Sequence, residues 1–174
     1  NIRTKELFER WLEMNVFTSY MRSHEGNRPS TNFQFYQSDE TLDLMARMTS
    51  IRVMLKPYLM HIVDEAVSSG YPVQRPIFMH YPDDHKTYDL QYEYLFGSDV
   101  MVKHVVQPDQ SLQEVYLPED DWIHLWTGKF CKGNQSVIVN CPIGYPPVFY
   151  RKDSSFRTLF EKITQIYGEK GERI

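Results

Sequence analysis

Residues 115–128, VYLPEDDWIHLWTG, place two short runs of aliphatic and aromatic side chains on either side of a turn-forming PEDD. Similar short runs, separated by prolines and glycines, extend over residues 76–151. Runs of this length and spacing are typical of an antiparallel β-sandwich. Trp122 and Trp126 could stack on a sugar ring or belong to a core, and the regular strand and turn residues around them favour the core.

The strand pattern is plainest at residues 136–141, SVIVNC. Successive side chains of a strand point to opposite faces, so Val137, Val139 and Cys141 share one face. This alternation predicts a half-buried antiparallel strand.

Residues 5–16 have the spacing of an amphipathic helix, with Thr4 as a suitable N-cap. The apolar positions of this helix are Leu7, Phe8, Trp11, Leu12 and Val16. The next residues, VFTSYM at 16–21, are β-branched and aromatic, which predicts one short strand.

A longer helical stripe runs from Asp39 to Ala66 at steps of three and four residues. Ser38 or Asp39 can cap its start, and Gly70 ends it. Pro57 predicts a kink or a break near Lys56, because proline has no amide hydrogen to donate. Residues 154–167 return to helical spacing before a charged tail.

The composition limits the classes of function. Of the 174 residues 41% are hydrophobic and 14% aromatic, as in a globular protein. The net charge of -4 is spread without a basic stripe, which argues against a nucleic-acid partner. No apolar run approaches the roughly 20 residues of a membrane span. The chain begins with Asn1 close to a folded helix, so we expect it to be a piece of a longer protein.

Two cysteines, Cys131 and Cys141, are too few for a disulfide framework and have no metal-ligand neighbours. We expect both thiols to be buried, because cysteine packs as a small apolar residue. The low cysteine count favours a cytoplasmic location over an oxidising one.

No catalytic constellation stands out among the residues. YPDDH at 81–85 could form a metal corner, but Pro-Asp-Asp is turn chemistry, and we favour the turn. We predict that His61, His104 and His124 pack in or beside the core. No metal site and no cofactor site is therefore expected.

Arg22 and His24 differ in context from the other polar residues. They follow the predicted strand and precede a long polar loop, HEGNRPSTNFQFYQS, which begins at His24. Loops at strand ends often carry functional residues. A ligand contact is one interpretation, and hydrogen bonding within the loop is the other.

Taken together, several segments resemble the carboxyl-terminal part of family 31 glycoside hydrolases, the α-glucosidase family. The similar motifs occur in the family's order over most of the chain: FTSYMRSH at 17–24, LKPYL at 55–59, RPIFMHYPDD at 75–84, QYEYLFGSDVMV at 91–102, VYLPEDDWIHLWTG at 115–128 and NCPIGYPPVFYR at 140–151. Within the family, the extended MRSHEGNRP and the end after one terminal helix are most similar to sulfoquinovosidases. Lys103 and His104 depart from the family, which usually has a small residue and a proline there, so we expect local repacking.

The resemblance implies an α+β fold in three parts. Residues 1–70 would be the last strand and helices of a (β/α)8 barrel, residues 71–153 an antiparallel proximal β-sandwich, and residues 154–174 a terminal helix and tail. The remaining barrel of the parent enzyme would be a partner of this fragment.

The resemblance also implies a function. Family members are retaining glycosidases with one aspartate as nucleophile and another as acid/base, and neither aspartate motif occurs in this sequence. His24 aligns with a histidine that hydrogen-bonds sugar hydroxyls, and Arg22 would hold the loop or a carboxylate beside the site. The roles of Glu25, Asn27 and Arg28 stay open. The expected substrate is an α-sulfoquinovoside or an α-glucoside, and the segment alone should be inactive.

The sequence is also compatible with two alternatives to an enzyme segment. One is a non-catalytic carbohydrate-binding or structural β-sandwich module, with Trp122 and Trp126 as its ligand platform. The other is a remnant with no activity.

Overall fold

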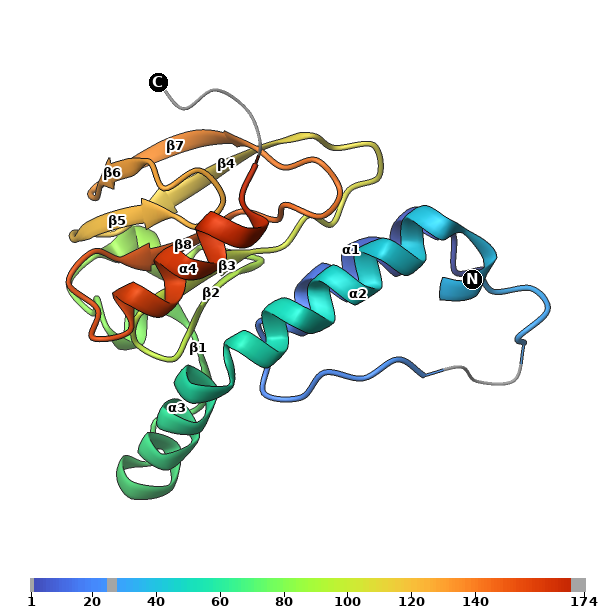
Figure 1. The fold of residues 1–174 in the computed structure, drawn as a ribbon. Coiled ribbons are helices and arrows are strands. Elements are labelled where there is room, and N and C mark those ends of the chain that lie inside the picture. Colours follow the sequence, from blue (N-terminus) through green and yellow to red (C-terminus); the bar gives the residue numbers. More distant parts are fainter. Residues whose placement is uncertain (1, 25–27, 170–174) are drawn as a thin grey trace.

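The computed structural model of the chain describes residues 2–24 and 28–169, which form helices beside two antiparallel sheets (Figure 1). The α-helices are α1 Lys5–Val16, α2 Asp39–Met54, α3 Lys56–Ser69 and α4 Arg157–Tyr167; short 3-10 helices lie at Phe35–Gln37, Ile77–Met79 and His85–Tyr88. The strands are β1 Gln74–Arg75, β2 Glu93–Phe96, β3 Val100–Lys103, β4 Leu112–Leu117, β5 Asp121–His124, β6 Phe130–Lys132, β7 Gln135–Asn140 and β8 Val148–Arg151. The predicted α+β class is confirmed. Glu25, Asn27 and the tail residues 170–174 lie outside the described residues.

The helix boundaries follow the capping residues. The Thr4 hydroxyl accepts from the Leu7 amide at 3.2 Å, and the Ser38 hydroxyl accepts from the Thr41 amide at 3.4 Å. The long stripe breaks at Leu55, between α2 and α3, because Pro57 cannot continue the amide ladder. Gly70 ends α3 with a φ of 79°, a left-handed conformation that glycine adopts without strain. These predictions are confirmed.

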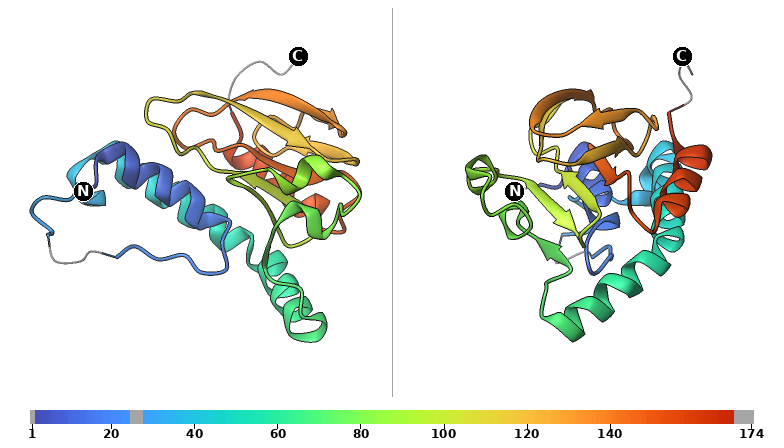
Figure 2. Two further views of the ribbon diagram at one scale, coloured as in Figure 1. Left: turned by 180° about the vertical axis from the view of Figure 1, so that it is seen from behind. Right: turned by 90° about the vertical axis from the view of Figure 1, so that its left-hand side faces the viewer.

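The strand predicted at residues 16–21 is wrong. Val16 is the last residue of α1, and residues 18–24 form no ladder with any described strand. A strand is stable only when a neighbour pairs with its backbone groups. Figure 2 shows this segment running back alongside α1. Among the described residues, no strand is therefore available to pair with this β-branched and aromatic segment.

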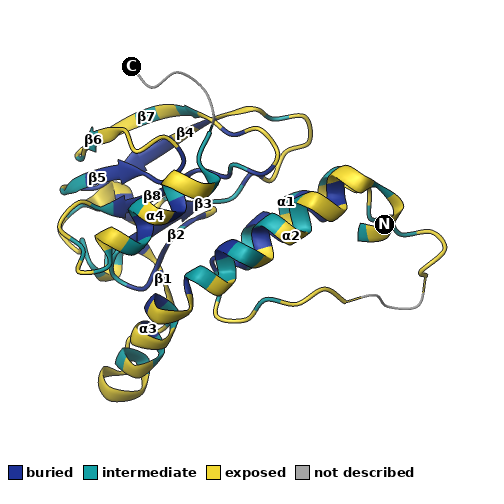
Figure 3. Ribbon diagram, viewed as in Figure 1, coloured by how far each residue is buried: buried dark blue, intermediate teal, exposed yellow. Residues whose placement is uncertain are grey.

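The larger sheet has the order β1-β2-β3-β8-β5-β6, and β4 pairs with β7 in a second sheet. Alternate residues of the larger sheet enter two different cores. In β3, Val100 and Val102 join α1, α2 and α4 in the first core, whereas Met101 lies in the second core with Val115 of β4. The larger sheet thus packs against helices on one face and against the β4–β7 sheet on the other, and Figure 3 shows dark buried residues along its central strands.

The strand predicted at residues 136–141 is confirmed as β7. Val137 and Val139 are half-buried while Ile138 between them is exposed, and the register places Val137 opposite Val115 of β4. Cys141 is fully buried, as predicted. Cys131 is only half-buried, because β6 is the edge strand of its sheet.

Both tryptophans of the motif at 115–128 lie in the core. Trp122 is 0% exposed and Trp126 is 1% exposed. The Trp122 Nε1 donates to the Pro118 carbonyl at 3.0 Å, and the Trp126 Nε1 donates to the Pro146 carbonyl. Neither ring has a free face for a sugar. This burial contradicts the alternative in which these rings form a carbohydrate platform.

The predicted terminal helix is confirmed as α4. Phe160 and Ile163 enter the first core, and the Thr164 hydroxyl donates to the Leu125 carbonyl at 2.6 Å. Because Phe8, Leu12 and Val16 of α1 belong to that same core, the amino-terminal helices and the sheet are packed as one body.

Candidate functional site

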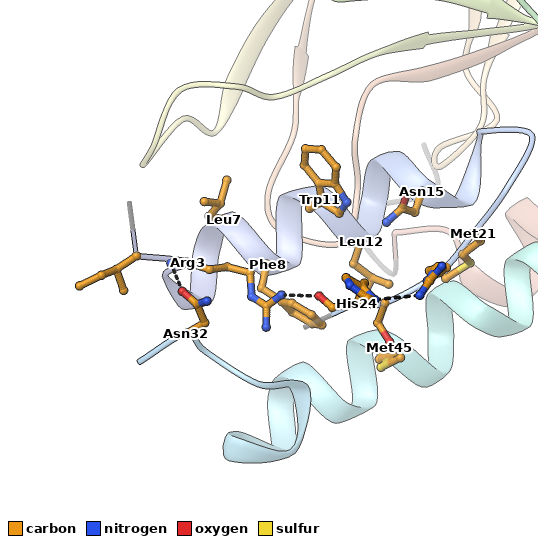
Figure 4. Close-up of a pocket in the computed structure, with 13 residues that line it drawn as sticks. Arg3, Leu7, Phe8, Trp11, Leu12, Asn15, Met21, His24, Asn32 and Met45 are labelled. Atoms are coloured by element: carbon orange, nitrogen blue, oxygen red, sulfur yellow. Dashed lines mark hydrogen bonds between the residues drawn. The ribbon is translucent and has the colours of Figure 1, made fainter. Parts of the chain in front are cut away.

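A cavity of about 460 Å³ lies between α1 and residues 21–24, and both Arg22 and His24 line it (Figure 4). The other lining residues come from α1 and the residues before it, from Asn32 in the loop, and from Met45 of α2. The structure therefore brings the two predicted site residues into one cavity, with α1 as the opposite wall.

Arg22 and His24 interact directly. The Arg22 Nη2 lies 2.8 Å from the His24 Nδ1. A guanidinium has only donors and stays protonated in proteins, so the Nδ1 must be the acceptor. In the neutral imidazole this contact leaves the ring proton on Nε2. The free edge of the ring is a hydrogen-bond donor.

Arg3 ties the backbone of the site segment to the start of α1. Its Nη1 donates to the His24 carbonyl at 3.1 Å (Figure 4), and its Nε donates to the Phe33 carbonyl at 3.0 Å. Its amide also donates to the Asn32 Oδ1 at 2.9 Å. One side chain thus joins the start of the loop at His24 to Phe33, nine residues further along it. Sequence reasoning missed Arg3, because an arginine that binds carbonyl groups leaves no motif.

Arg52 of α2 holds the other end of the segment. Its guanidinium donates to the Val16 carbonyl at 2.8 Å and to the Ser19 carbonyl at 3.0 Å, and it also reaches the Thr18 carbonyl. These carbonyls lie at and beyond the end of α1, where helix bonds run out. The side chain replaces part of the missing ladder and fixes the path that leads to Arg22.

The α1 wall of the cavity is apolar. Leu7 is 49% exposed and Trp11 is 57% exposed, although the helix pattern predicted that both would face the core. Phe8, Leu12 and Val16 occupy the core face instead. The helix therefore carries a second apolar strip, which the described residues leave uncovered.

The residues at 81–85 form a turn, as favoured. The Asp84 carboxylate accepts from the Lys86 amide at 3.2 Å and from the Tyr116 hydroxyl at 2.7 Å, so it caps a 3-10 helix. His85 is exposed beside Tyr88. Among residues 2–24 and 28–169, no group of three or more His, Cys, Asp or Glu side chains could hold a metal ion.

The other histidines pack as predicted. The ring centroid of His61 lies 5.1 Å from that of Phe156, at the exposed rim of the helix layer. Burial lowers the pKa of His104 to about 4, beside the Tyr94 ring. Next to it, the Lys103 ammonium lies 2.6 Å from the buried Glu93 carboxylate.

Arg28, in the loop that begins at His24, is exposed, and its carbonyl accepts from the Thr31 and Asn32 amides.

The Arg22–His24 contact makes a spectroscopic prediction. In the Arg22→Met variant the Nδ1 loses its cationic donor, so a measurable fraction of His24 should carry its proton on Nδ1. The ¹⁵N shifts of the two ring nitrogens report this fraction. Arg22→Lys keeps a cationic donor and serves as the control. An unchanged tautomer in Arg22→Met would show that the contact does not fix the ring.

Comparisons of the sequence with known proteins find a matching family. Residues 1–62 match the model described as the glycosyl hydrolases family 31 TIM-barrel domain, and residues 70–155 match that of the glycosyl hydrolase family 31 C-terminal domain. The sulfoquinovosidase of Escherichia coli (strain K12) is 49% identical over 94% of this chain, and that of Agrobacterium fabrum is 47% identical over 95%. The alignments cover 24% and 25% of those proteins, so the chain spans about a quarter of their length.

A solved structure extends the comparison. A family 31 sulfoquinovosidase from E. rectale, in complex with an aza-sugar inhibitor, superposes with a TM-score of 0.94 at 51% identity, over 97% of this chain and 25% of that one. No helix within the described part of the chain is long and apolar enough to cross a membrane. The two matched domains and this superposition show that the chain belongs to glycoside hydrolase family 31 and is similar to sulfoquinovosidases over most of its length.

Proposed function

We propose that this chain is the carboxyl-terminal segment of a retaining α-glycosidase that hydrolyses α-sulfoquinovosides. The proposal rests on sequence identity, which is higher to sulfoquinovosidases than to an α-glucosidase. Identity is 49% and 47% to two sulfoquinovosidases, but 31% to an α-glucosidase of Bacillus thermoamyloliquefaciens over 86% of the chain. An α-glucoside is the second candidate substrate, because the α-glucosidase has the lower identity of these relatives.

The catalytic pair of such an enzyme lies outside this chain. A retaining glycosidase uses two carboxyl groups about 5–5.5 Å apart, one as nucleophile and one as acid/base. Neither of the family's aspartate motifs occurs in the sequence, so both aspartates would come from upstream barrel strands. Residues 1–70 would supply the last strand and helices of that barrel, residues 71–153 the proximal sandwich, and residues 154–174 the terminal helix and tail.

The uncovered side of the amino-terminal region supports the barrel assignment. Leu7 and Trp11 present an apolar strip, and residues 18–24 are extended without a paired neighbour among the described strands. The remaining barrel would cover both the apolar strip and the unpaired segment.

In this arrangement His24 binds substrate, and Arg22 positions the His24 ring. The His24 Nε2–H would donate to a hydroxyl oxygen of the sugar next to the bond that breaks. Contacts to such hydroxyls strengthen as the ring approaches the oxocarbenium-like transition state. Arg22 keeps the proton on Nε2, and Arg3 and Arg52 hold the backbone on either side. The two free thiols fit a reducing compartment such as the cytoplasm.

The complete enzyme tests the proposal. With 4-nitrophenyl α-sulfoquinovoside it should release the α-anomer first, as seen by proton NMR, because double displacement retains configuration. Its kcat/KM should exceed that for 4-nitrophenyl α-glucoside by at least about 100-fold, since a site built for a polar group rejects the analogue that lacks it. The 174-residue chain alone, as control, should show no turnover. Release of the β-anomer, a preference for the glucoside, or turnover by the chain alone would each contradict the proposal.

A further inference from the structure

The backbone of residues 16–19, which leads from α1 toward Arg22, is held by side chains of other elements. Arg52 of α2 donates to the carbonyls of residues 16, 18 and 19. The carbonyl of Phe17, between them, accepts from the Tyr94 hydroxyl at 2.8 Å. Because no described strand pairs with this segment, these side chains satisfy carbonyls that a ladder would otherwise satisfy.

Tyr94 belongs to β2, and its hydrogen bond reaches 77 positions along the chain. The alternation of β2 turns Tyr94 and Phe96 toward the helices, whereas Leu95 enters the other core. Burial raises the pKa of Tyr94, so the hydroxyl keeps the proton that it donates. The bond therefore joins the matched carboxyl-terminal domain to the segment that carries the candidate site.

His104 of the sandwich holds the Tyr94 ring in place. The two ring centroids lie 5.0 Å apart, and the His104 amide donates to the Tyr92 carbonyl at 2.9 Å. His104 is one of the two neighbouring positions at which this sequence departs from the family motif. The departure thus lies directly beside the residue that bonds the site segment.

We propose that Tyr94 is a positioning residue for the substrate site, acting through the Phe17 carbonyl. Arg22 and His24 follow Phe17 by five and seven residues, and Arg3 holds the far end of this stretch at the His24 carbonyl. Fixed at both points, the stretch keeps the His24 Nε2–H aligned with a sugar hydroxyl, and a small displacement of an aligned group lowers the rate. The inference rests on the proposed hydrolysis at this site.

Tyr94→Phe in the complete enzyme removes the hydroxyl and keeps the ring beside His104. We expect kcat for 4-nitrophenyl α-sulfoquinovoside to fall about fivefold, the factor that corresponds to one net hydrogen bond. KM should change by less than about twofold, because the contacts of His24 strengthen mainly in the transition state.

Tyr58→Phe is the matched control for lost stability. The Tyr58 hydroxyl is fully buried and also donates to a backbone carbonyl, that of Phe96 at 2.6 Å, so its removal should destabilise the fold at least as much. It also accepts from the Asp99 amide, and both of these contacts lie outside residues 16–24. At a temperature where both variants are folded, Tyr58→Phe should keep the kcat and KM of the parent enzyme.

Amide hydrogen exchange in the complete enzyme, followed by mass spectrometry, tests the positioning without substrate. The Phe17 amide donates to the Met14 carbonyl at 3.1 Å, and the Ser19 amide donates to the Gln74 Oε1 at 3.4 Å. Loss of the Tyr94 bond should let this stretch open more often. Exchange in the peptide that contains residues 17–24 should be at least about threefold faster in Tyr94→Phe and unchanged in Tyr58→Phe.

The two measurements separate this inference from the proposed function. A parent-like kcat in Tyr94→Phe, or an equal loss in Tyr58→Phe, would overturn the positioning role and leave hydrolysis at the site intact. If the complete enzyme hydrolyses no α-sulfoquinovoside, the proposed function fails, and exchange alone decides whether Tyr94 holds the segment. Faster exchange confined to Tyr94→Phe supports that role, and unchanged exchange overturns it in either case.

Discussion

Replacing His24 by alanine in the complete enzyme should lower kcat/KM for an α-sulfoquinovoside by about 100-fold. The Arg22 guanidinium, 2.8 Å from Nδ1, fixes the Nε2–H as a donor before substrate arrives. A donor that is already oriented stabilises developing charge without reorganisation, and removal of one such donor costs roughly 100- to 1,000-fold in other enzymes. The contact tightens toward the transition state, so kcat should fall more than KM rises.

Two further variants define this result. His24→Gln retains an amide donor of similar reach and should recover part of the loss. His85→Ala removes an exposed histidine of the sandwich that lines no part of the His24 cavity, so its rate should equal that of the parent enzyme. A His24→Ala enzyme within a factor of about two of the parent would remove His24 from the substrate site.

The elements that the sequence predicted are those whose signals are local. Thr4 and Ser38 cap helices through contacts three residues along, and Pro57 breaks a helix whatever surrounds it. The period of two in β7 likewise needs only one buried face. The strand at residues 16–21 failed for the opposite reason. A strand depends on a neighbour, and no described strand pairs with this one.

In the candidate site too, residues with a local signal were predicted from the sequence and residues held by distant contacts were not. Arg22 and His24 are two residues apart, so any backbone path would keep them near each other, and sequence reasoning selected both. Arg3 and Arg52 reach the site segment through carbonyl groups 21 and 33 to 36 positions away, which no local pattern encodes. Trp11 illustrates the limit on exposure: helical spacing assigns it to an apolar face but does not say which neighbour covers that face.

The contacts of Trp126 show how the sandwich supports the site segment. Its ring centroid lies 6.4 Å from that of Phe17, five residues before Arg22, and 5.7 Å from that of Tyr145. The Arg47 guanidinium lies over the same ring at 5.3 Å from its centroid and donates to the Tyr167 carbonyl at 2.6 Å. Trp126 therefore joins α2, the segment after α1 and the end of α4 in one core.

Trp126→Ala should lower the free energy of unfolding of the 174-residue chain by about 3–5 kcal/mol. The ring is 1% exposed, so its removal leaves a cavity that rigid neighbours fill only in part, and the Pro146 carbonyl loses its donor. Urea unfolding followed by circular dichroism measures the loss. Trp11→Ala is the matched control: with 57% of the residue exposed, it should cost no more than about 0.5 kcal/mol. Equal losses in the two variants would contradict the buried position of Trp126, and a Trp126→Ala chain that kept its stability would restore the possibility that this ring serves a ligand.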